Sequence, residues 1–229
     1  MHKTFQNIEE LDGYFLKTDS EKLYIKNRPL IISVLSELEK IQTSGFINDG
    51  QKELIELALS SQFEGLTYNI IGVQLSALSA KFDDIKNYLL DLSNANKAEI
   101  RFNNVVNAQL IKDEHFRNEI YQVGLKDKSQ KVLEKTIEEV LSGKKIKRDF
   151  LHLVKDAINC IKNGETKSFL TALLEMNQKG YAVEKNGSNY CIYVKKKKGF
   201  LCWDVNKEKF EKIKNLRIYI FKELLKNDL

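Results

Sequence analysis

Residues 124–141 of the sequence read GLKDKSQKVLEKTIEEVL, and this stretch decides the fold class. The glycine and the polar group Asp127-Lys128-Ser129 are typical of a turn, because such residues favour backbone conformations outside a helix. Apolar side chains then recur at the i, i+3 and i+4 spacing of one helix face: Val132, Leu133, Ile137, Val140 and Leu141. The stretch therefore predicts a turn followed by an amphipathic helix.

The same alternation of turn and apolar stripe fills most of the chain on both sides of this stretch. Further helical stripes occupy residues 30–41, 54–59, 66–78, 83–92, 97–111, 116–123, 150–161 and 169–176. We therefore expect eight or nine helices in a row, joined by short turns. Consecutive helices with short connections pack antiparallel, and a succession of such pairs is the layout of an α-solenoid.

Two local signals predict where helices begin. Pro29 is the only proline, and we place it in the first turn of a helix, where its missing backbone donor costs nothing. Asp113 is predicted to cap the helix that carries Phe116, because a carboxylate at that position accepts hydrogen bonds from the first free backbone N–H groups.

Residues 124–141 resemble the second half of a HEAT-like repeat. In that family an aspartate between helices is followed by a Val-Arg pair and by a small residue at the helix contact. Asp127 and Val132 match this pattern, whereas Leu133 stands in place of the arginine and Thr136 in place of the small residue.

An upstream segment keeps the pair as Ile100-Arg101, with Asp91 as its turn aspartate, and Ile100 precedes Val132 by 32 residues. The resemblance implies that the β-branched residue packs between two helices while the guanidinium reaches the aspartate of the adjacent turn. A HEAT-like stack and an irregular helical bundle both stay open as architectures.

After Gln178 the pattern changes from helix to strand. Residues 181–185, 190–194 and 200–205 predict a small three-stranded antiparallel β-meander, followed by a terminal helix over 207–226. We expect a mainly α chain with a helical repeat domain, 1–178, and a cap, 179–229. Residues 151–205 are similar to the module that follows the catalytic domain in plasmid mobilisation relaxases, although the metal-binding histidine cluster of relaxases has no counterpart here.

Motifs for common chemistries are missing from the sequence. There is no phosphate-binding loop, dinucleotide-binding glycine motif or nucleophile elbow, and the three histidines have no metal-ligand spacing. Cys160, Cys191 and Cys202 form no CxxC and are expected to be reduced, with Cys191 and Cys202 in neighbouring predicted strands where they could face each other. We therefore predict no cofactor, no metal and no enzymatic activity.

Charge divides the chain into two halves. Residues 1–123 hold 13 Lys and Arg against 18 Asp and Glu, a net charge of −5, whereas residues 124–229 hold 24 against 14, a net charge of +10. A basic half favours an acidic partner, either a phosphate backbone or an acidic protein surface. The alternative is that lysine is simply the favoured surface residue of this sequence.

These observations favour a non-enzymatic module that binds another protein, as bacterial immunity proteins bind a toxin. The alternative is a nucleic-acid-binding protein that uses the basic half, and a helical-repeat DNA glycosylase is a more distant third. The residues expected to contact a partner are Arg101, Lys131, Lys135, Lys144, Lys145, Lys147, Arg148, Lys195, Lys196, Lys197, Lys198 and Trp203.

With no signal-peptide pattern and no apolar run of about 18 residues, we expect a cytoplasmic location and no membrane partner.

Overall fold

The computed structural model of the chain describes residues 8–16, 21–60, 70–142, 146–179, 183–186, 191–194, 199–204 and 209–213. The chain forms two compact units, and the boundary between them lies within one helix, between Thr136 and Ile137. We call residues 2–136 the N-terminal unit and residues 137–229 the C-terminal unit. The described residues are mainly helical, as the sequence predicts. None of the described helices combines the length and the apolar character needed to cross a lipid bilayer.

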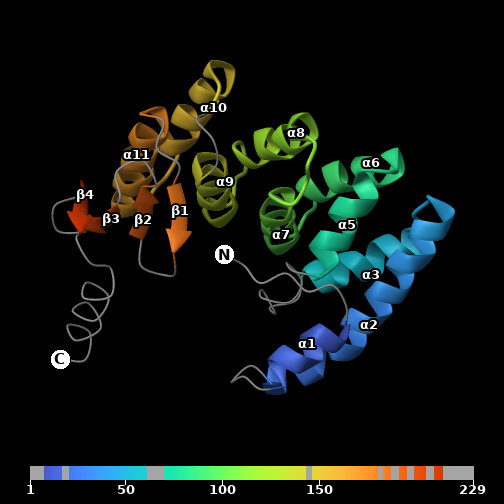
Figure 1. Ribbon diagram of the computed structural model, residues 1–229. Coiled ribbons are helices and arrows are strands. Elements are labelled where there is room, and N and C mark those ends of the chain that lie inside the picture. Colours follow the sequence, from blue (N-terminus) through green and yellow to red (C-terminus); the bar gives the residue numbers. More distant parts are fainter. Residues whose placement is uncertain are drawn as a thin grey trace. The chain divides into compact units, whose positions relative to one another are not determined.

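Helices account for nearly all of the described N-terminal unit (Figure 1). They are α1 (Ile8–Phe15), α2 (Glu21–Ser44), α3 (Asp49–Leu59), α5 (Gly72–Ser79), α6 (Asp83–Ser93), α7 (Ala98–Ala108), α8 (Glu114–Gly124) and the first half of α9 (Gln130–Ser142). Two further helices, α10 (Arg148–Asn159) and α11 (Gly164–Gln178), belong to the C-terminal unit. The described residues thus form ten helices, against the eight or nine that we expected.

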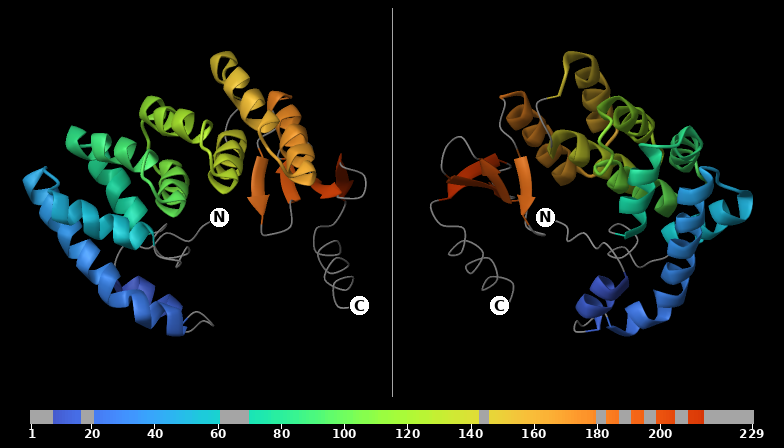
Figure 2. Two further views of the ribbon diagram at one scale, coloured as in Figure 1. Left: turned by 180° about the vertical axis from the view of Figure 1, so that it is seen from behind. Right: turned by 45° about the vertical axis from the view of Figure 1, so that its right-hand side comes forward.

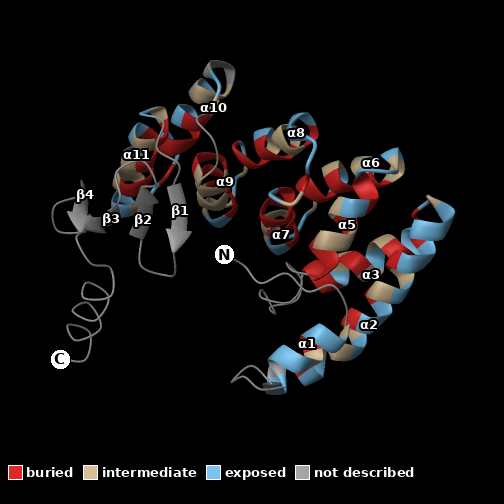
Figure 3. Cartoon of the chain, in the orientation of Figure 1, coloured by how far each residue is buried: buried red, intermediate tan, exposed pale blue. Residues whose placement is uncertain are grey.

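Helix α7 is the centre of the N-terminal unit. It packs against α3, α5, α6 and α8, and residues 103–108 are all buried, so that most of its length is coloured as buried in Figure 3. Helix α2 packs along α3, an arrangement that both views of Figure 2 show. Apolar side chains fill the space between these helices, including Ile55, Leu59, Leu75, Ile85, Leu89, Val105 and Ile120.

Local capping groups set several helix starts. Asp113 accepts hydrogen bonds from the backbone N–H groups of His115 and Phe116, which confirms its predicted role. Asn48 and Gln51 form a reciprocal capping box at the start of α3. Such a box satisfies two of the backbone donors that a helix start leaves free.

The predicted position of Pro29 in a first helical turn is wrong. Helix α2 begins at Glu21 and Pro29 lies inside it, where one intrahelical hydrogen bond is missing. The turns before the proline are held from outside, because Arg28 donates to the two oxygens of Asp12 in α1 at 2.7 and 2.6 Å, and Tyr24 also donates to Asp12. A contact distant in sequence therefore overrides the local proline signal.

The C-terminal unit contains a four-stranded antiparallel sheet in the order β1 (Val183–Asn186), β2 (Cys191–Val194), β3 (Gly199–Asp204) and β4 (Lys209–Ile213). Both outer strands, β1 and β4, contact α11. The sequence predicted three strands and then a helix from residue 207. Residues 209–213 instead pair with β3, with Phe210 opposite Trp203, so the predicted helix is wrong over this segment. Five residues are too few for apolar spacing to separate a strand from a helix.

The remainder of that predicted helix, residues 214–226, lies outside the described residues. The division of the chain also differs from the boundary that we placed between residues 178 and 179. Helices α10 and α11 belong to the same compact unit as the sheet. The sequence could not predict a unit boundary inside α9, because the apolar spacing of a helix continues through Thr136 and Ile137 without a turn.

Gly124 lies where α8 comes close to both α7 and α9 in the N-terminal unit. A Cβ atom at this position would lie 2.4 Å from Thr136 Oγ1 in α9 and 3.1 Å from Val105 Cγ2 in α7. Thr136 is fully buried, and its hydroxyl donates to the Val132 carbonyl at 2.7 Å. The close contact of α8 with α9 therefore depends on glycine at position 124.

We predict that Gly124→Ala lowers the free energy of unfolding by about 1–3 kcal/mol, the usual cost of overpacking, despite the better helix propensity of alanine. Adding Thr136→Ala removes the nearest atoms of the clash, so the double variant should be more stable than the sum of the two single changes predicts. Urea denaturation of the wild type and the three variants measures this. Strict additivity would contradict the described contact.

Candidate functional site

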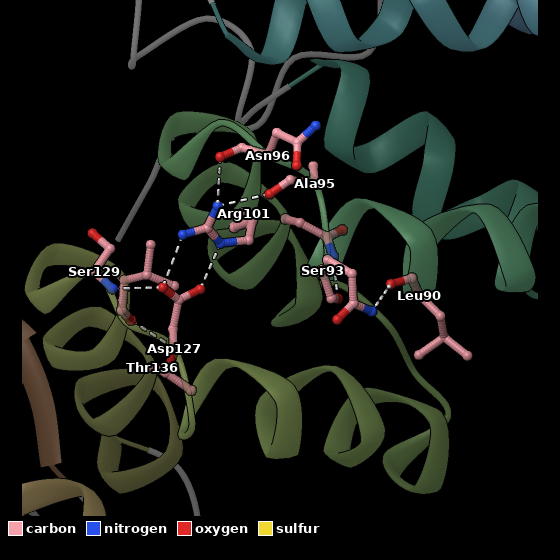
Figure 4. Close-up of polar contacts among 11 residues, drawn as sticks. Leu90, Ser93, Ala95, Asn96, Arg101, Asp127, Ser129 and Thr136 are labelled. Atoms are coloured by element: carbon pink, nitrogen blue, oxygen red, sulfur yellow. Dashed lines mark hydrogen bonds and ion pairs between the residues drawn. The ribbon is translucent and has the colours of Figure 1, made fainter.

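Arg101, in the first turn of α7, joins two turns of the N-terminal unit. Its Nε donates to Asp127 Oδ2 at 2.6 Å and its Nη2 donates to Asp127 Oδ1 at 3.0 Å, a two-pronged ion pair (Figure 4). Its Nη1 donates to the carbonyls of Ala95 and Asn96 at 2.7 and 3.0 Å. The guanidinium thus binds the α6–α7 turn and the α8–α9 turn at once.

Asp127 is nearly enclosed, with its side chain 5% exposed against 16% for Arg101. Its Oδ1 also accepts from the backbone N–H of Ser129 at 2.7 Å, just before α9 begins. The hydrogen bond to Asp127 raises the pKa of the Arg101 guanidinium, and the negative charge of the carboxylate adds to this effect. The pair therefore links the two turns through two side-chain hydrogen bonds.

This contact matches the one that the sequence led us to expect, a guanidinium on the aspartate of an adjacent turn. Its acceptor is Asp127, whereas Asp91, the turn aspartate that we assigned to this pair, is an exposed residue within α6. Arg101 was also expected to contact a partner. Its guanidinium instead makes contacts within the unit, because Nε and Nη2 donate to Asp127 and Nη1 donates to the turn carbonyls.

An open groove of about 900 Å³ lies over this link. The turn residues Asn94, Asn96, Lys126 and Lys128 line it together with Gln122 from the last turn of α8, and all five are exposed. The remaining described lining residues are Leu90, Ser93, Ala95, Arg101, Glu119, Val123 and Asp127. The groove is therefore an open surface feature built from helix ends, with both polar and apolar groups in its lining.

The groove presents hydrogen-bonding groups from both turns. Arg101 and Asp127 neutralise each other, and Glu119 Oε1 lies 3.2 Å from His115 Nδ1 on the outside of α8. Within the described ranges, no three His, Cys, Asp or Glu side chains gather closely enough to hold a metal ion. What the lining can do is bind the polar groups of a partner.

Two other predicted contact residues lie on α9 in the same unit. Lys131 is exposed, and its Nζ lies 4.6 Å from the centre of the Phe102 ring in α7, within the range of a cation–π contact. Lys135 is half-buried one turn further along α9. Sequence reasoning missed Phe102, which supplies the aromatic half of this contact.

The other predicted contact residues belong to the C-terminal unit. Lys147 is exposed immediately before α10, Arg148 is the first residue of α10, and Trp203 lies in β3 at a position paired with Phe210. Lys144, Lys145 and the four lysines 195–198 lie outside the described residues. Of the predicted set, the described structure places Arg101, Lys131 and Lys135 in the N-terminal unit, on α7 and α9.

Buried asparagines are a second feature that sequence reasoning missed. Asn103 donates to the carbonyl of Leu59, the last residue of α3, and Asn104 donates to Leu89 O and Ser93 Oγ in α6, both at 2.8 Å. In the C-terminal unit, Asn177 donates to Leu141 O at 3.1 Å. The sequence did carry a signal for these buried amides, because asparagines at i, i+1 and i+4, which are Asn103, Asn104 and Asn107, interrupt the apolar stripe of α7. These amides satisfy carbonyls near helix ends, which would otherwise be costly to bury.

We predict that Asp127→Asn lowers the free energy of unfolding by about 3–5 kcal/mol, because it leaves the Arg101 guanidinium without a counter-charge in a mostly buried site. Asp113→Asn is the matched control. Asp113 is exposed and only caps a helix, a role that asparagine fills almost equally well, so this change should cost less than about 0.5 kcal/mol. Equal effects of the two substitutions in urea denaturation would show that Asp127 acts only as a turn residue.

Comparisons of the chain with protein-family models, with curated proteins and with solved structures find no match. The function is therefore argued from the residues and the geometry described above.

Proposed function

We propose that this chain is a non-enzymatic module that binds another protein through the surface of its helix pairs. One observation carries the proposal: the open groove of about 900 Å³, lined by the ends of helices α6 and α8 and by the turns that follow them. Sites that take small molecules are usually enclosed and mostly apolar, with a few polar groups. A wide, open groove at helix ends, lined by both polar and apolar groups, is better suited to a protein segment.

The charged groups at this site also favour binding over catalysis. An active site usually contains an ionisable group whose proton affinity is tuned for reaction. Here the enclosed pair, Arg101 and Asp127, is used to hold two turns together. The exposed groups around it, such as Asn96 and Gln122, are neutral amides that donate and accept hydrogen bonds with a partner's backbone.

Exposed apolar side chains elsewhere in the N-terminal unit support the same proposal. Phe46 is 61% exposed and Leu57 is 55% exposed, and on α2 both Ile25 and Ile32 face outward on one stripe with Pro29. Large apolar groups next to polar ones are typical of surfaces that bind proteins. None of these residues lines the groove, because they lie on α2, on α3 and, for Phe46, in the connection between the two helices.

In its narrower form the proposal is that the chain acts as a bacterial immunity protein, in the cytoplasm, and neutralises a cognate toxin. Its support is the mainly helical architecture, which small immunity proteins share. The partner would then be encoded next to this chain.

A stack of HEAT-like repeats is the architecture that we propose for the N-terminal unit, on the basis of the Arg101–Asp127 contact.

The test uses the purified products of the genes adjacent to this one, each titrated against the full chain by isothermal calorimetry. We expect one of them to form a stoichiometric complex that Gln122→Arg weakens at least about tenfold, or about 1.4 kcal/mol. Gln42→Arg, an equally exposed change on α2, is the matched control and should leave the affinity unchanged. No binding by any product, or equal loss with both variants, would contradict the proposal.

A second candidate is a nucleic-acid-binding protein, which the net charge of +10 over residues 124–229 favours. Strand β2 ends at Val194 and β3 begins at the paired residue Gly199, so the four lysines 195–198 connect two hydrogen-bonded strands. Lysines clustered in one connection can neutralise several adjacent phosphates.

For this candidate, affinity for mixed-sequence DNA or RNA should fall about 10³–10⁵-fold between 50 and 200 mM salt if six to ten phosphates are contacted. Replacing Lys195, Lys196, Lys197 and Lys198 by glutamine should reduce the salt dependence. Replacing the exposed lysines 22, 26, 81 and 97 of the N-terminal unit should not. No retention of nucleic acid at 50 mM salt would eliminate this candidate.

A further inference from the structure

Two of the three cysteines occupy one register position in the sheet of the C-terminal unit. Strands β2 and β3 pair antiparallel, and Cys191 lies directly opposite Cys202. The same register places Val194 opposite Gly199, so the pair is three positions from the end of the paired segment. The third cysteine, Cys160, is an exposed residue at the end of α10.

The spacing of antiparallel strands suits a disulfide at such a position. Directly opposed residues have Cα atoms about 5.5 Å apart in a hydrogen-bonded pair and about 4.5 Å apart in a non-hydrogen-bonded pair. Disulfides join residues whose Cα atoms are about 4.4–6.8 Å apart. Both kinds of antiparallel pair therefore fall within the range that a disulfide requires, without a change of register.

The alternation of side chains along a strand gives the pair a common face. By this register, Cys191 and Cys202 occupy positions of one face of the sheet, and Ile192 and Leu201 occupy positions of the other. Glu184 in β1 and Glu211 in β4 fall on the face of the cysteines, since they stand opposite Tyr193 and Cys202.

We propose that Cys191 and Cys202 form a redox-active dithiol, which a small-molecule disulfide such as oxidised glutathione converts to a disulfide across β2 and β3. The bond would join the two strands on either side of residues 195–198. The proposal stands apart from the groove of the N-terminal unit, so the two can fail independently.

The reaction proceeds in two exchange steps. The thiolate of one cysteine attacks a sulfur of oxidised glutathione, which forms a mixed disulfide and releases one glutathione thiolate. The thiolate of the opposed cysteine then attacks the protein sulfur of that mixed disulfide, which forms the Cys191–Cys202 bond and releases the second glutathione. Two protein thiols are oxidised, and one glutathione disulfide is reduced to two thiols.

The experiment uses the full chain with Cys160→Ser, which removes the exposed third thiol, equilibrated in glutathione buffers of increasing oxidised fraction. We expect an intact mass 2 Da lower than that of the reduced chain and a peptide map in which Cys191 is linked to Cys202. In this background, Cys191→Ser and Cys202→Ser should each give only the mixed disulfide with glutathione.

A register-shifted variant keeps the number of thiols and tests the geometry. In the same background, Cys191→Ser with Ile192→Cys moves one thiol to the opposite face, and its equilibrium constant for disulfide formation should fall at least about tenfold, or about 30 mV for two electrons. Circular dichroism of each reduced variant checks that the fold is retained. Mixed disulfides alone in the Cys160→Ser chain, or equal equilibrium constants for the shifted pair, would overturn the proposal.

Discussion

Arg101 and Asp127 are 26 residues apart in the sequence, yet their side chains meet in a two-pronged ion pair that is mostly enclosed. A buried guanidinium is expensive unless its donors are satisfied, and this one also binds the carbonyls of Ala95 and Asn96. The carboxylate in turn holds the backbone of Ser129 at the start of α9. One interaction thus fixes the α6–α7 turn relative to the α8–α9 turn, and the positions of α7, α8 and the first half of α9 follow from it.

The link between the turns also determines the surface above them. The groove is lined by the residues that flank the ion pair, so a rigid pair gives a rigid floor to the exposed amides Asn96 and Gln122. Binding surfaces benefit from such rigidity, because less conformational freedom is lost when the partner arrives. The charges of Arg101 and Asp127 are therefore part of the scaffold that holds the two turns together.

Periodicity predicted most helices of the described chain, because the apolar stripes are long and their turns carry clear signals such as Asp113. It failed in two places where contacts between elements decide the outcome. The bond of Arg28 to Asp12 holds α2 before Pro29. The pairing of Phe210 with Trp203 in the adjacent strand gives β4 in place of a helix. For the site, the sequence pointed to Arg101 and Asp127 separately but not to their mutual contact, since it assigned Arg101 to the exposed Asp91. The groove had no signal, because it is formed by residues from two turns that meet only in the folded chain.

Hydrogen exchange measured by mass spectrometry on the full chain, comparing the wild type with Arg101→Lys, tests most directly whether this ion pair couples the two turns. Lysine keeps the charge but loses the paired donors that reach both oxygens of Asp127. The account predicts faster exchange at the start of α7 and, equally, in the first turn of α9. Faster exchange confined to α7, with the amides of α9 unchanged, would contradict it.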